Sequence, residues 1–216
     1  MRIISLGWGV QSFTLAAMTA LGELPPMDAA IHADTTHERA ATYQFAQRWT
    51  PWLHAHGVSV VTVQATPERR DPCYSVTKPN HFLPLFTTYE DGRPSGMLHR
   101  QCTNEWKIRP IHQWLQANRN RQPVDQCIGI SLDEATRMNP ARVQYITNTW
   151  PLVDQRMTRL DCIRWLNNHD LETPTKSACV FCPFHDRATW HQLQQPNGSD
   201  WQHALEIDEK VRHKRP

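Results

Sequence analysis

The sequence predicts an α/β protein with a Rossmann-like parallel sheet and helices on both faces. Two observations carry this prediction. Short β-branched or apolar runs that fit buried strands alternate with longer stretches of helical apolar period. Polar and glycine-bearing turns separate the two kinds of segment, and no internal repeat interrupts the alternation. Strands that alternate with helices imply right-handed βαβ crossovers and therefore a parallel sheet.

The first unit to justify is Arg2–Leu21, which reads as a strand, a loop and a helix. A short β-branched run leads into the loop Ser5–Ser12, and an Ala-, Leu- and Met-rich stretch follows it. Gly7 and Gly9 allow the backbone to approach a bulky anion, and the helix supplies unpaired N–H groups and the positive end of its dipole. The loop therefore predicts phosphate binding, with an ordinary strand-to-helix turn as the alternative, because it lacks a Walker lysine and a full GxGxxG.

The later elements follow from the same periodicities, with prolines and polar clusters between them. A Thr-x-x-Asp capping box opens one of the helices. One long stretch has no period, but its aromatic residues favour a packed or substrate-ordered lid over disorder. The expected elements are strands at Met27–Ala33, Val58–Val63 and Val124–Ile130, helices at Glu38–His56 with a kink or break at Pro51, at Cys102–Asn118, at Thr158–Asn168 and at Arg187–Val211 with a break at Pro196–Ser199, and the lid at Thr66–Gln101.

The length of 216 residues suits one domain with a substantial core and a small appendage. We expect an α/β domain over residues 1–170 and a Cys-bearing loop with helices over residues 171–216. The 23 Lys and Arg against 21 Asp and Glu give a formal net charge of +2, which argues against a basic coat for nucleic acid. Local basic clusters, such as Arg100–Arg109, leave a polyanionic partner open.

The sequence favours a cytoplasmic protein without a membrane partner. No stretch is long and apolar enough to span a bilayer. The start could pass for a signal peptide, but Gly7, Gly9 and Gln11 interrupt its apolar run. Six cysteines, two of them in a CxxC, look more like metal ligands than like a secreted disulfide framework.

Cys179 and Cys182 form that CxxC, whose spacing can hold a tetrahedral metal or two irons of a cluster. Cys102 is the best candidate for a further ligand, because it lies where a loop enters a helix and a helix N-terminus stabilises thiolate. A redox CxxC is the alternative, although the helix-opening context of such motifs is missing here. We expect Cys127 and Cys162 to be core residues, leave Cys73 ambiguous, and consider His185 as a fourth ligand.

Polar groups also follow two predicted strands. Asp34 and Glu38 could bind Mg²⁺ through water, or Asp34 could cap a helix. A second group, Asp133, Glu134 and Arg137, follows the strand near residue 130. Each set alone fits a structural role, but the carboxyl ends of parallel strands share one edge of a sheet, where ligands bind.

Lys107 and Arg109 follow Cys102 at helical spacing. They could place positive charge on phosphates bound near the first loop. The alternative is a solvated helix face, which is the favoured interpretation when these two residues are taken by themselves.

The succession SLGWGVQS, ADTTHE, QCTNEWKIRPI, IGISLDEATR and KSACVFCPF resembles the phosphoadenylylsulfate reductase-like branch of the PP-loop, or N-type, ATP pyrophosphatase superfamily, with its adenine nucleotide alpha hydrolase-like fold. In that superfamily a Ser-Gly-Gly-x-Asp-Ser loop wraps the phosphates of an adenine nucleotide. The window Gly7–Ser12 occupies its place, with Gly7 for the first Ser, Trp8 for a Gly and Gln11 for the Asp. The reductases carry four cluster cysteines, whereas Thr103 leaves only three here, a set that resembles the three-cysteine clusters of tRNA- and DNA-thiolating enzymes.

The resemblance implies an ATP-binding enzyme, with residues 1–170 as the PP-loop domain, that adenylates a substrate and transfers sulfur onto a nucleic acid or a nucleotide. A phosphoadenylylsulfate-type reductase, or a non-catalytic nucleotide-binding protein with structural zinc, is the alternative. It further implies ATP, Mg²⁺ and a [4Fe–4S] cluster (or Zn²⁺) as cofactors, and an adenine nucleotide, a sulfur donor protein or sulfide, and a second copy in a homodimer as partners.

The roles that the resemblance assigns fall into three sets of residues. Catalytic roles go to Lys107, Arg109 and Arg137, nucleotide and Mg²⁺ binding to Ser5, Gly7, Trp8, Gly9, Val10, Gln11, Ser12, Asp34, Thr35 and Glu38, and metal ligation to Cys102, Cys179 and Cys182.

Overall fold

The structure is a computed structural model that describes residues 1–77, 82–194 and 198–212. The chain divides into two compact units. The sheet unit comprises residues 1–33, 41–63 and 111–177, and the cysteine unit comprises residues 34–40, 64–110 and 178–216. The units interleave along the chain, whereas the sequence suggested a single boundary near residue 170; the functional division expected there stays a prediction.

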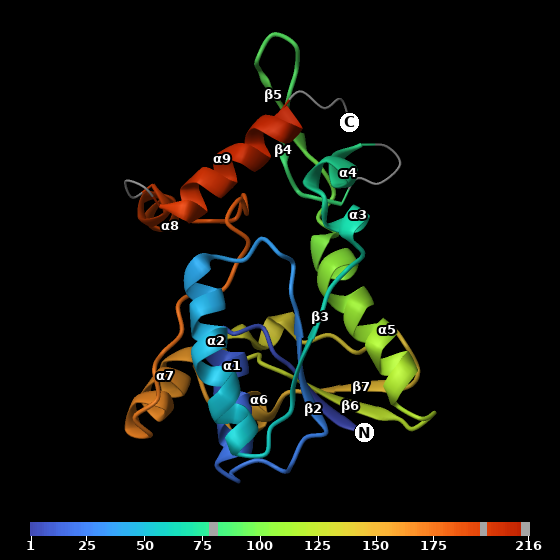
Figure 1. Cartoon of the computed structure of the whole chain (residues 1–216), viewed down its shortest axis with the longest axis vertical. Helices are drawn as coiled ribbons and strands as arrows, with labels where there is room; N and C mark the ends of the chain where they lie inside the picture. The colour runs from blue at the N-terminus through green and yellow to red at the C-terminus, as the bar shows by residue number, and fades with distance from the viewer. Residues whose placement is uncertain (78–81, 195–197, 213–216) are drawn as a thin grey trace. The chain divides into compact units, whose positions relative to one another are not determined.

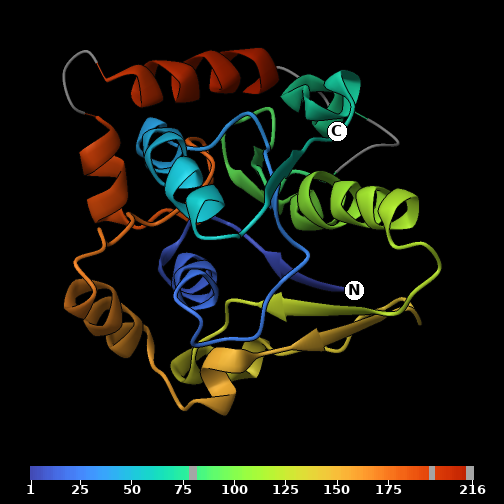
Figure 2. The same ribbon diagram turned by 60° about the horizontal axis from the view of Figure 1, so that its bottom comes forward.

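The sheet unit is built on one five-stranded parallel sheet of order β3-β2-β1-β6-β7. Its centre pairs β1 with β6, two strands far apart in the sequence that lie side by side in Figure 2. The order reverses direction at β1, where such sheets bind their ligands. The strands are β1 (Arg2–Ser5), β2 (Ala29–Ala33), β3 (Val60–Val63), β6 (Val124–Ile128) and β7 (Ile146–Thr149).

Helices cover both faces of this sheet, as the sequence predicted. Ile4 and its neighbours on one face pack against α1, α2 and α7, whereas Ile3 on the other face packs with Ile111 and Leu115 of α5. Because neighbouring residues of a strand point to opposite faces, the pair Ile3-Ile4 contributes to both cores. Figure 1 shows α1 and α5 on opposite sides of the strands. The helices are α1 (Val10–Ala20), α2 (Ala40–Ala55), α5 (Arg109–Asn118), α6 (Pro151–Asp154) and α7 (Arg159–Asn168), with a 3-10 turn η2 (Leu132–Arg137).

Proline residues affect two of the helices in different ways. Pro51 lies inside α2 without ending it; both Pro51 and Gln47, whose carbonyl loses its partner, are exposed, so water can replace the missing bond. The helix expected at Cys102–Asn118 instead begins with the π-helical turn η1 (Thr103–Ile108) before α5. Pro110 explains this difference, because its ring clashes with the carbonyl four residues earlier in a regular α-helix.

The cysteine unit contains short helices and a hairpin. The stretch expected as a packed or substrate-ordered lid is packed where it is described, because Phe82 and Leu83 are buried against Trp106, and its role as a lid stays a prediction. The predicted break at Pro196–Ser199 lies mostly outside the described residues. The elements of this unit are α3 (Pro67–Arg70), α4 (Pro72–Val76), the antiparallel strands β4 (Phe86–Thr88) and β5 (Pro94–Met97), η1, α8 (Arg187–Leu193) and α9 (Ser199–Arg212).

Three further expectations are settled by the structure. The capping box forms, since Thr158 and Asp161 exchange hydrogen bonds of 3.2 and 3.0 Å through backbone N–H and side-chain oxygen atoms. Cys127 and Cys162 are core residues, 3% and 0% exposed. Within the described ranges, no helix has the length and apolar character needed to cross a bilayer.

Gly129, directly after β6, is where α1 approaches the sheet most closely. A Cβ atom there would lie 2.7 Å from the backbone nitrogen of Ser12. We therefore expect Gly129→Ala to lower the free energy of unfolding by about 1–3 kcal/mol, because backbone cannot yield as a flexible side chain does. Gly7→Ala is the matched control, since its Cβ would meet Ser12 Oγ at 3.8 Å, an ordinary contact. Urea unfolding measures both, and equal stability of the two variants would contradict the expectation.

Candidate functional site

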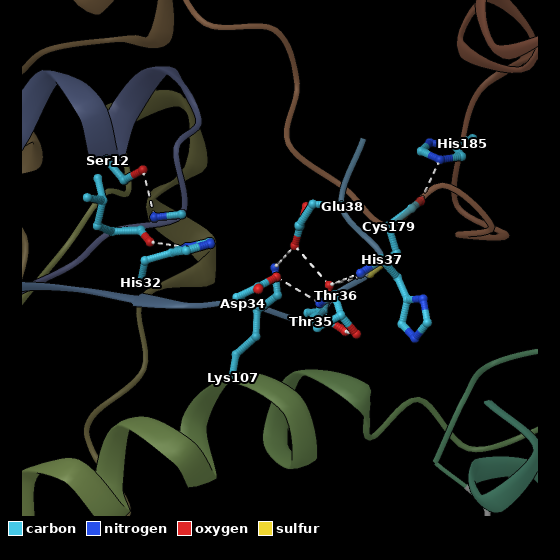
Figure 3. A network of polar contacts seen from close by, with 12 residues as sticks. Ser12, His32, Asp34, Thr35, Thr36, His37, Glu38, Lys107, Cys179 and His185 are labelled. Atoms are coloured by element: carbon cyan, nitrogen blue, oxygen red, sulfur yellow. Dashed lines mark hydrogen bonds and ion pairs between the residues drawn. The ribbon is translucent and has the colours of Figure 1, made fainter. Parts of the chain in front are cut away.

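The loop between β1 and α1 has the geometry of an anion-binding turn. Ser12 Oγ accepts a hydrogen bond from the Gly7 N–H at 3.1 Å and donates one to the Gly9 carbonyl at 3.2 Å, so the loop is folded back on itself (Figure 3). Gly9 caps α1 without a side-chain hydrogen bond, and the first turn carries no acidic residue. The first N–H groups of a helix have no intrahelical partner, so this end favours an anion.

Two residues close to this loop were not predicted from the sequence. Gly129 presses against the first turn of α1, and Ser177 has its hydroxyl oxygen 3.3 Å from where a Gly9 Cβ would be. A larger side chain at Gly9 would therefore displace Ser177. Ser177 belongs to the string KSACVFCPF, one of the segments that carry the family resemblance, and this was the signal in the sequence that could have indicated it.

Trp8 explains how the loop keeps its shape without the glycine of the family pattern. Its φ angle of 54° is left-handed, an unusual conformation for a bulky residue. The indole is only 2% exposed and packs near the rings of Phe13, His32 and Phe45. Burial of a large aromatic ring offsets the backbone strain. Trp8 is thus a core residue of the sheet unit, and its role in nucleotide binding stays a prediction.

Gln11, the residue in place of the motif's Asp, links the loop to two later segments. Its Nε2 donates to Ser131 Oγ at 3.3 Å and to Glu134 Oε2 at 3.1 Å, and its Oε1 accepts from Arg159 Nη1 at 3.1 Å. Both ends of the amide are thereby occupied and fixed in orientation. This arrangement gives residue 11 a bridging role in place of the metal-binding role of a carboxylate.

The polar group expected after the strand near residue 130, which is β6, joins this same network. Glu134 forms an ion pair of 2.7 Å with Arg137, whose side chain is 65% exposed. Asp133 accepts from the Arg159 backbone N–H at 2.9 Å, and the Ser131 hydroxyl bonded to Asp133 is the main cause that holds its pKa below the usual value. The structure therefore brings Gln11, Glu134 and Arg137 together, and it adds Arg159, which sequence reasoning missed.

In the cysteine unit, Asp34 organises a turn. Its two carboxylate oxygens accept from the Thr36 N–H and from Gln64 Nε2, each at 2.7 Å. Thr36 has a left-handed φ of 64°, which this side-chain bond helps to hold. The expectation that Asp34 caps a helix is wrong, because α2 begins only at Ala40, whose N–H donates to Asp200 Oδ1. The bonds of Asp34 are those of a turn-capping residue, and its contact with Mg²⁺ or a nucleotide stays a prediction.

Glu38 is a buried carboxylate of the cysteine unit that forms an ion pair with Lys107. Its side chain is 1% exposed and its Oε1 lies 3.0 Å from Lys107 Nζ, while the Lys107 side chain is 39% exposed (Figure 3). Burial lowers the pKa of Lys107, but the charge and hydrogen bond of Glu38 together with the charges of Cys179 and Cys102 outweigh this and leave the pKa above its usual value. Lys107 is therefore a fixed cation. Thr35 Oγ1 lies 3.5 Å from both Glu38 Oε1 and Cys179 Sγ and connects the carboxylate to the thiol.

The three predicted metal-ligand cysteines all belong to the cysteine unit. A backbone bridge pairs Glu38 with Cys179, and the Cys182 N–H donates to the Cys179 carbonyl at 3.0 Å. Burial, followed by the charge of Glu38, raises the pKa of Cys179 to about 12, and burial also raises the pKa of Cys102. Cys102 and Cys179 also pack against the same hydrophobic cluster, which contains Trp106.

These thiols are soft donors that suit iron or zinc. In the part of the chain that the structure describes, however, no group of three His, Cys, Asp or Glu side chains is gathered closely enough to hold a metal ion. His185, the fourth candidate, donates from Nε2 to the Cys179 carbonyl at 2.9 Å and so stabilises the CxxC turn. The donor set fits a metal in kind, and metal binding stays a prediction.

The remaining predicted cation, Arg109, pairs with Glu105 at 3.3 Å, and Arg69 binds the same carboxylate at 2.6 Å. These bonds fit the structural alternative, and a catalytic role for Arg109 stays a prediction.

Sequence reasoning also missed a pair of histidines. His37 Nε2–H donates to the Arg70 carbonyl at 2.9 Å, so its Nδ1 accepts from His203 Nε2 at 3.1 Å. Burial lowers the pKa of His37, which keeps it neutral.

The comparisons with known proteins identify the fold. No family model matches the sequence, and no curated protein matches it. A solved structure of phosphoadenylyl-sulfate reductase from Candida auris, described as a phosphate complex, superposes with a TM-score of 0.53 over 80% of this chain and 74% of that chain. The chain has the fold of phosphoadenylylsulfate reductase. The two sequences are 11% identical, so the likeness confirms the α/β fold class expected from the motifs and leaves activity to be argued from the residues.

If Cys102, Cys179 and Cys182 share a metal, each Cys→Ser variant should lose most of the metal that the wild-type protein holds, because a site of three thiolates tolerates no missing ligand. Cys73→Ser is the matched control, since it removes a partly exposed cysteine of the same unit that is outside the predicted set. Iron, zinc and acid-labile sulfide are measured after anaerobic purification. Zinc without sulfide would contradict the cluster, and unchanged metal in the three variants would contradict the site.

Proposed function

We propose that the protein is an adenine-nucleotide-dependent sulfur-transfer enzyme of the phosphoadenylylsulfate reductase-like branch of the PP-loop superfamily. One observation carries the proposal: the folded-back loop Gly7–Ser12 at the uncapped start of α1, tied through Gln11 to Arg159. That arrangement offers backbone donors and a cation to phosphate groups at the point where the sheet order reverses.

Arg159 is the cation that this loop has close at hand. A guanidinium carries five N–H donors, and the bond to Gln11 uses one of them. The others suit bidentate contacts to phosphate oxygens. Because both ends of the Gln11 amide are occupied, we assign no magnesium to residue 11, and Mg²⁺ enters with ATP as part of the substrate.

The proposed reaction has two steps, adenylation of the acceptor and displacement of AMP by sulfide. An acceptor oxygen attacks the α-phosphate of ATP, the bond from the α-phosphorus to the bridging oxygen breaks, and pyrophosphate leaves with that electron pair. Sulfide then forms a bond to the acceptor carbon, and AMP leaves with the former acceptor oxygen. Lys107 and Arg109 are proposed to neutralise the leaving pyrophosphate, and Arg137, through its link to Glu134 and Gln11, to orient the phosphates.

The cysteines are proposed to handle the sulfur. Three thiolates would hold a [4Fe–4S] cluster with one iron open, which supplies a binding position for sulfide, with Zn²⁺ as the alternative. Cys179 is half-buried, and its sulfur lies 3.5 Å from Thr35 Oγ1, which also contacts Glu38. Sulfide or a sulfur donor protein would supply the atom, and a nucleic acid or a nucleotide in the cytoplasm would accept it, with a homodimer as the oligomeric proposal.

A second candidate function is reduction of a phosphosulfate nucleotide. The solved neighbour, a phosphoadenylyl-sulfate reductase, favours it. A reductase needs no acceptor oxygen and releases no pyrophosphate from ATP. A non-catalytic nucleotide-binding protein with structural zinc would show neither reaction, so the three readings are separable in one assay series.

Arg159→Met should weaken ATP binding about tenfold or more, the amount expected when a charged hydrogen bond is lost. Arg164→Met is the matched control, because Arg164 lies on the same helix, is 66% exposed and pairs with Asp161 instead. Isothermal titration calorimetry with MgATP measures both, after circular dichroism has established that the variants are folded. Equal ATP affinity in the two variants would remove Arg159 from the site.

Wild-type protein should release pyrophosphate from ATP only when an RNA or DNA acceptor is added, because adenylation of the acceptor comes first, and it should release AMP only when sulfide is also present. Lys107→Met should slow this release roughly 100-fold while MgATP affinity changes little, because the cation acts on the leaving group. Glu38→Gln tests the alternative: it breaks the pair with Lys107 but keeps the cation. If Glu38→Gln loses as much activity as Lys107→Met, the lysine only supports Glu38; acceptor-independent sulfite release from a phosphosulfate nucleotide would favour the reductase.

A further inference from the structure

The cysteine unit contains a cavity that the reaction above does not use. Its volume is about 840 Å³, within the range of small-ligand pockets. The hairpin strand β4, the CxxC turn, α8 and α9 supply its walls. All of these segments belong to one compact unit, so the cavity is a property of that unit alone.

Among the described residues, four aromatic side chains line the cavity together with aliphatic ones. Trp190 and Trp201 meet edge to face, with ring centroids 6.3 Å apart and an interplanar angle of 79°, and Phe181 and Phe86 also line the cavity. Phe86 is 71% exposed, so its ring is accessible to a ligand from solvent. Indole and phenyl faces of this kind bind planar rings by stacking.

The charge of the cavity excludes a phosphate ligand. Asp208 and Arg212 are the charged residues in its described lining, and they pair with each other, Arg212 Nε lying 2.9 Å from Asp208 Oδ2. The lining is therefore electrically balanced, unlike a site for a polyanion. The hydroxyl groups of Thr87 and Ser95, together with the Asp208 carboxylate, can satisfy the hydrogen-bonding edge of a neutral ring.

We propose that this cavity binds the nucleobase of the sulfur acceptor, as a free nucleoside or as a base presented by a single strand. Phe181 lies between Cys179 and Cys182 in sequence and lines the cavity, so a base bound here rests against the turn that carries the thiols. The assignment as acceptor site rests on the proposed function, whereas binding of a base stands on the cavity itself.

Equilibrium dialysis of the full chain against labelled uridine, cytidine, adenosine and guanosine tests the proposal, with inorganic phosphate and a short oligoribonucleotide as further probes. At least one nucleoside should bind, and saturating MgATP should not displace it. Phe86→Ser should weaken binding about tenfold, the loss expected for one stacking partner. Tyr89→Ser is the matched control, because Tyr89 is an exposed aromatic at the same hairpin that does not line the cavity.

The outcomes separate the two proposals. Nucleoside binding that Phe86→Ser weakens supports the cavity even if ATP does not bind; preference for the oligoribonucleotide then identifies the strand as the source of the base. Displacement by ATP, equal loss in both variants, binding of phosphate alone, or no nucleoside binding would overturn the cavity proposal and leave the ATP site standing. A Phe86-dependent dimer in sedimentation, without nucleoside binding, would also overturn it, since a second copy would then be the occupant.

Discussion

The sheet unit depends on the close contact between the start of α1 and the end of β6. Gly129 leaves no room for a Cβ atom beside Ser12, and this contact brings the loop within reach of the segments that follow β6. Gln11 can then bond to Ser131, Glu134 and Arg159 at once. A bridging amide is neutral, so it orders a carboxylate and a guanidinium without adding charge of its own. The loop before α1 and the two later polar segments are therefore joined by side-chain hydrogen bonds.

The cysteine unit depends instead on a buried charge. Glu38 is almost inaccessible to water, and a buried carboxylate is costly unless a cation and hydrogen bonds compensate it. Lys107 provides the cation, and the Thr35 hydroxyl contacts both the Glu38 carboxylate and the Cys179 sulfur. Burial, followed by the charge of the same carboxylate, raises the pKa of that thiol. A cation, a carboxylate and a thiol thus influence one another's charge in this unit. Such opposed groups are frequent at reactive sites.

The substitutions in the loop motif have physical explanations that favour binding. Trp8 takes the left-handed conformation of a glycine and is held there by aromatic packing. Gln11 exchanges a carboxylate for an amide that is fully engaged. Neither change removes the backbone donors of the loop or the helix dipole, which are the interactions that attract phosphate. In this loop Gln11 is bonded to the guanidinium of Arg159, a source of positive charge that sequence reasoning missed.

The sequence by itself determined the α/β class, the strands β1, β2, β3 and β6, the loop before α1 and the capping box at Thr158, because periodicity, glycine placement and capping chemistry are local. It could not find β7 or the π-helical start at Thr103, since a short strand and a proline-displaced turn depend on their neighbours. The roles of Gln11, Glu38 and Arg159 were decided only by tertiary structure: each acts through partners distant in sequence, and burial, which gives those contacts their strength, is a property of the folded chain.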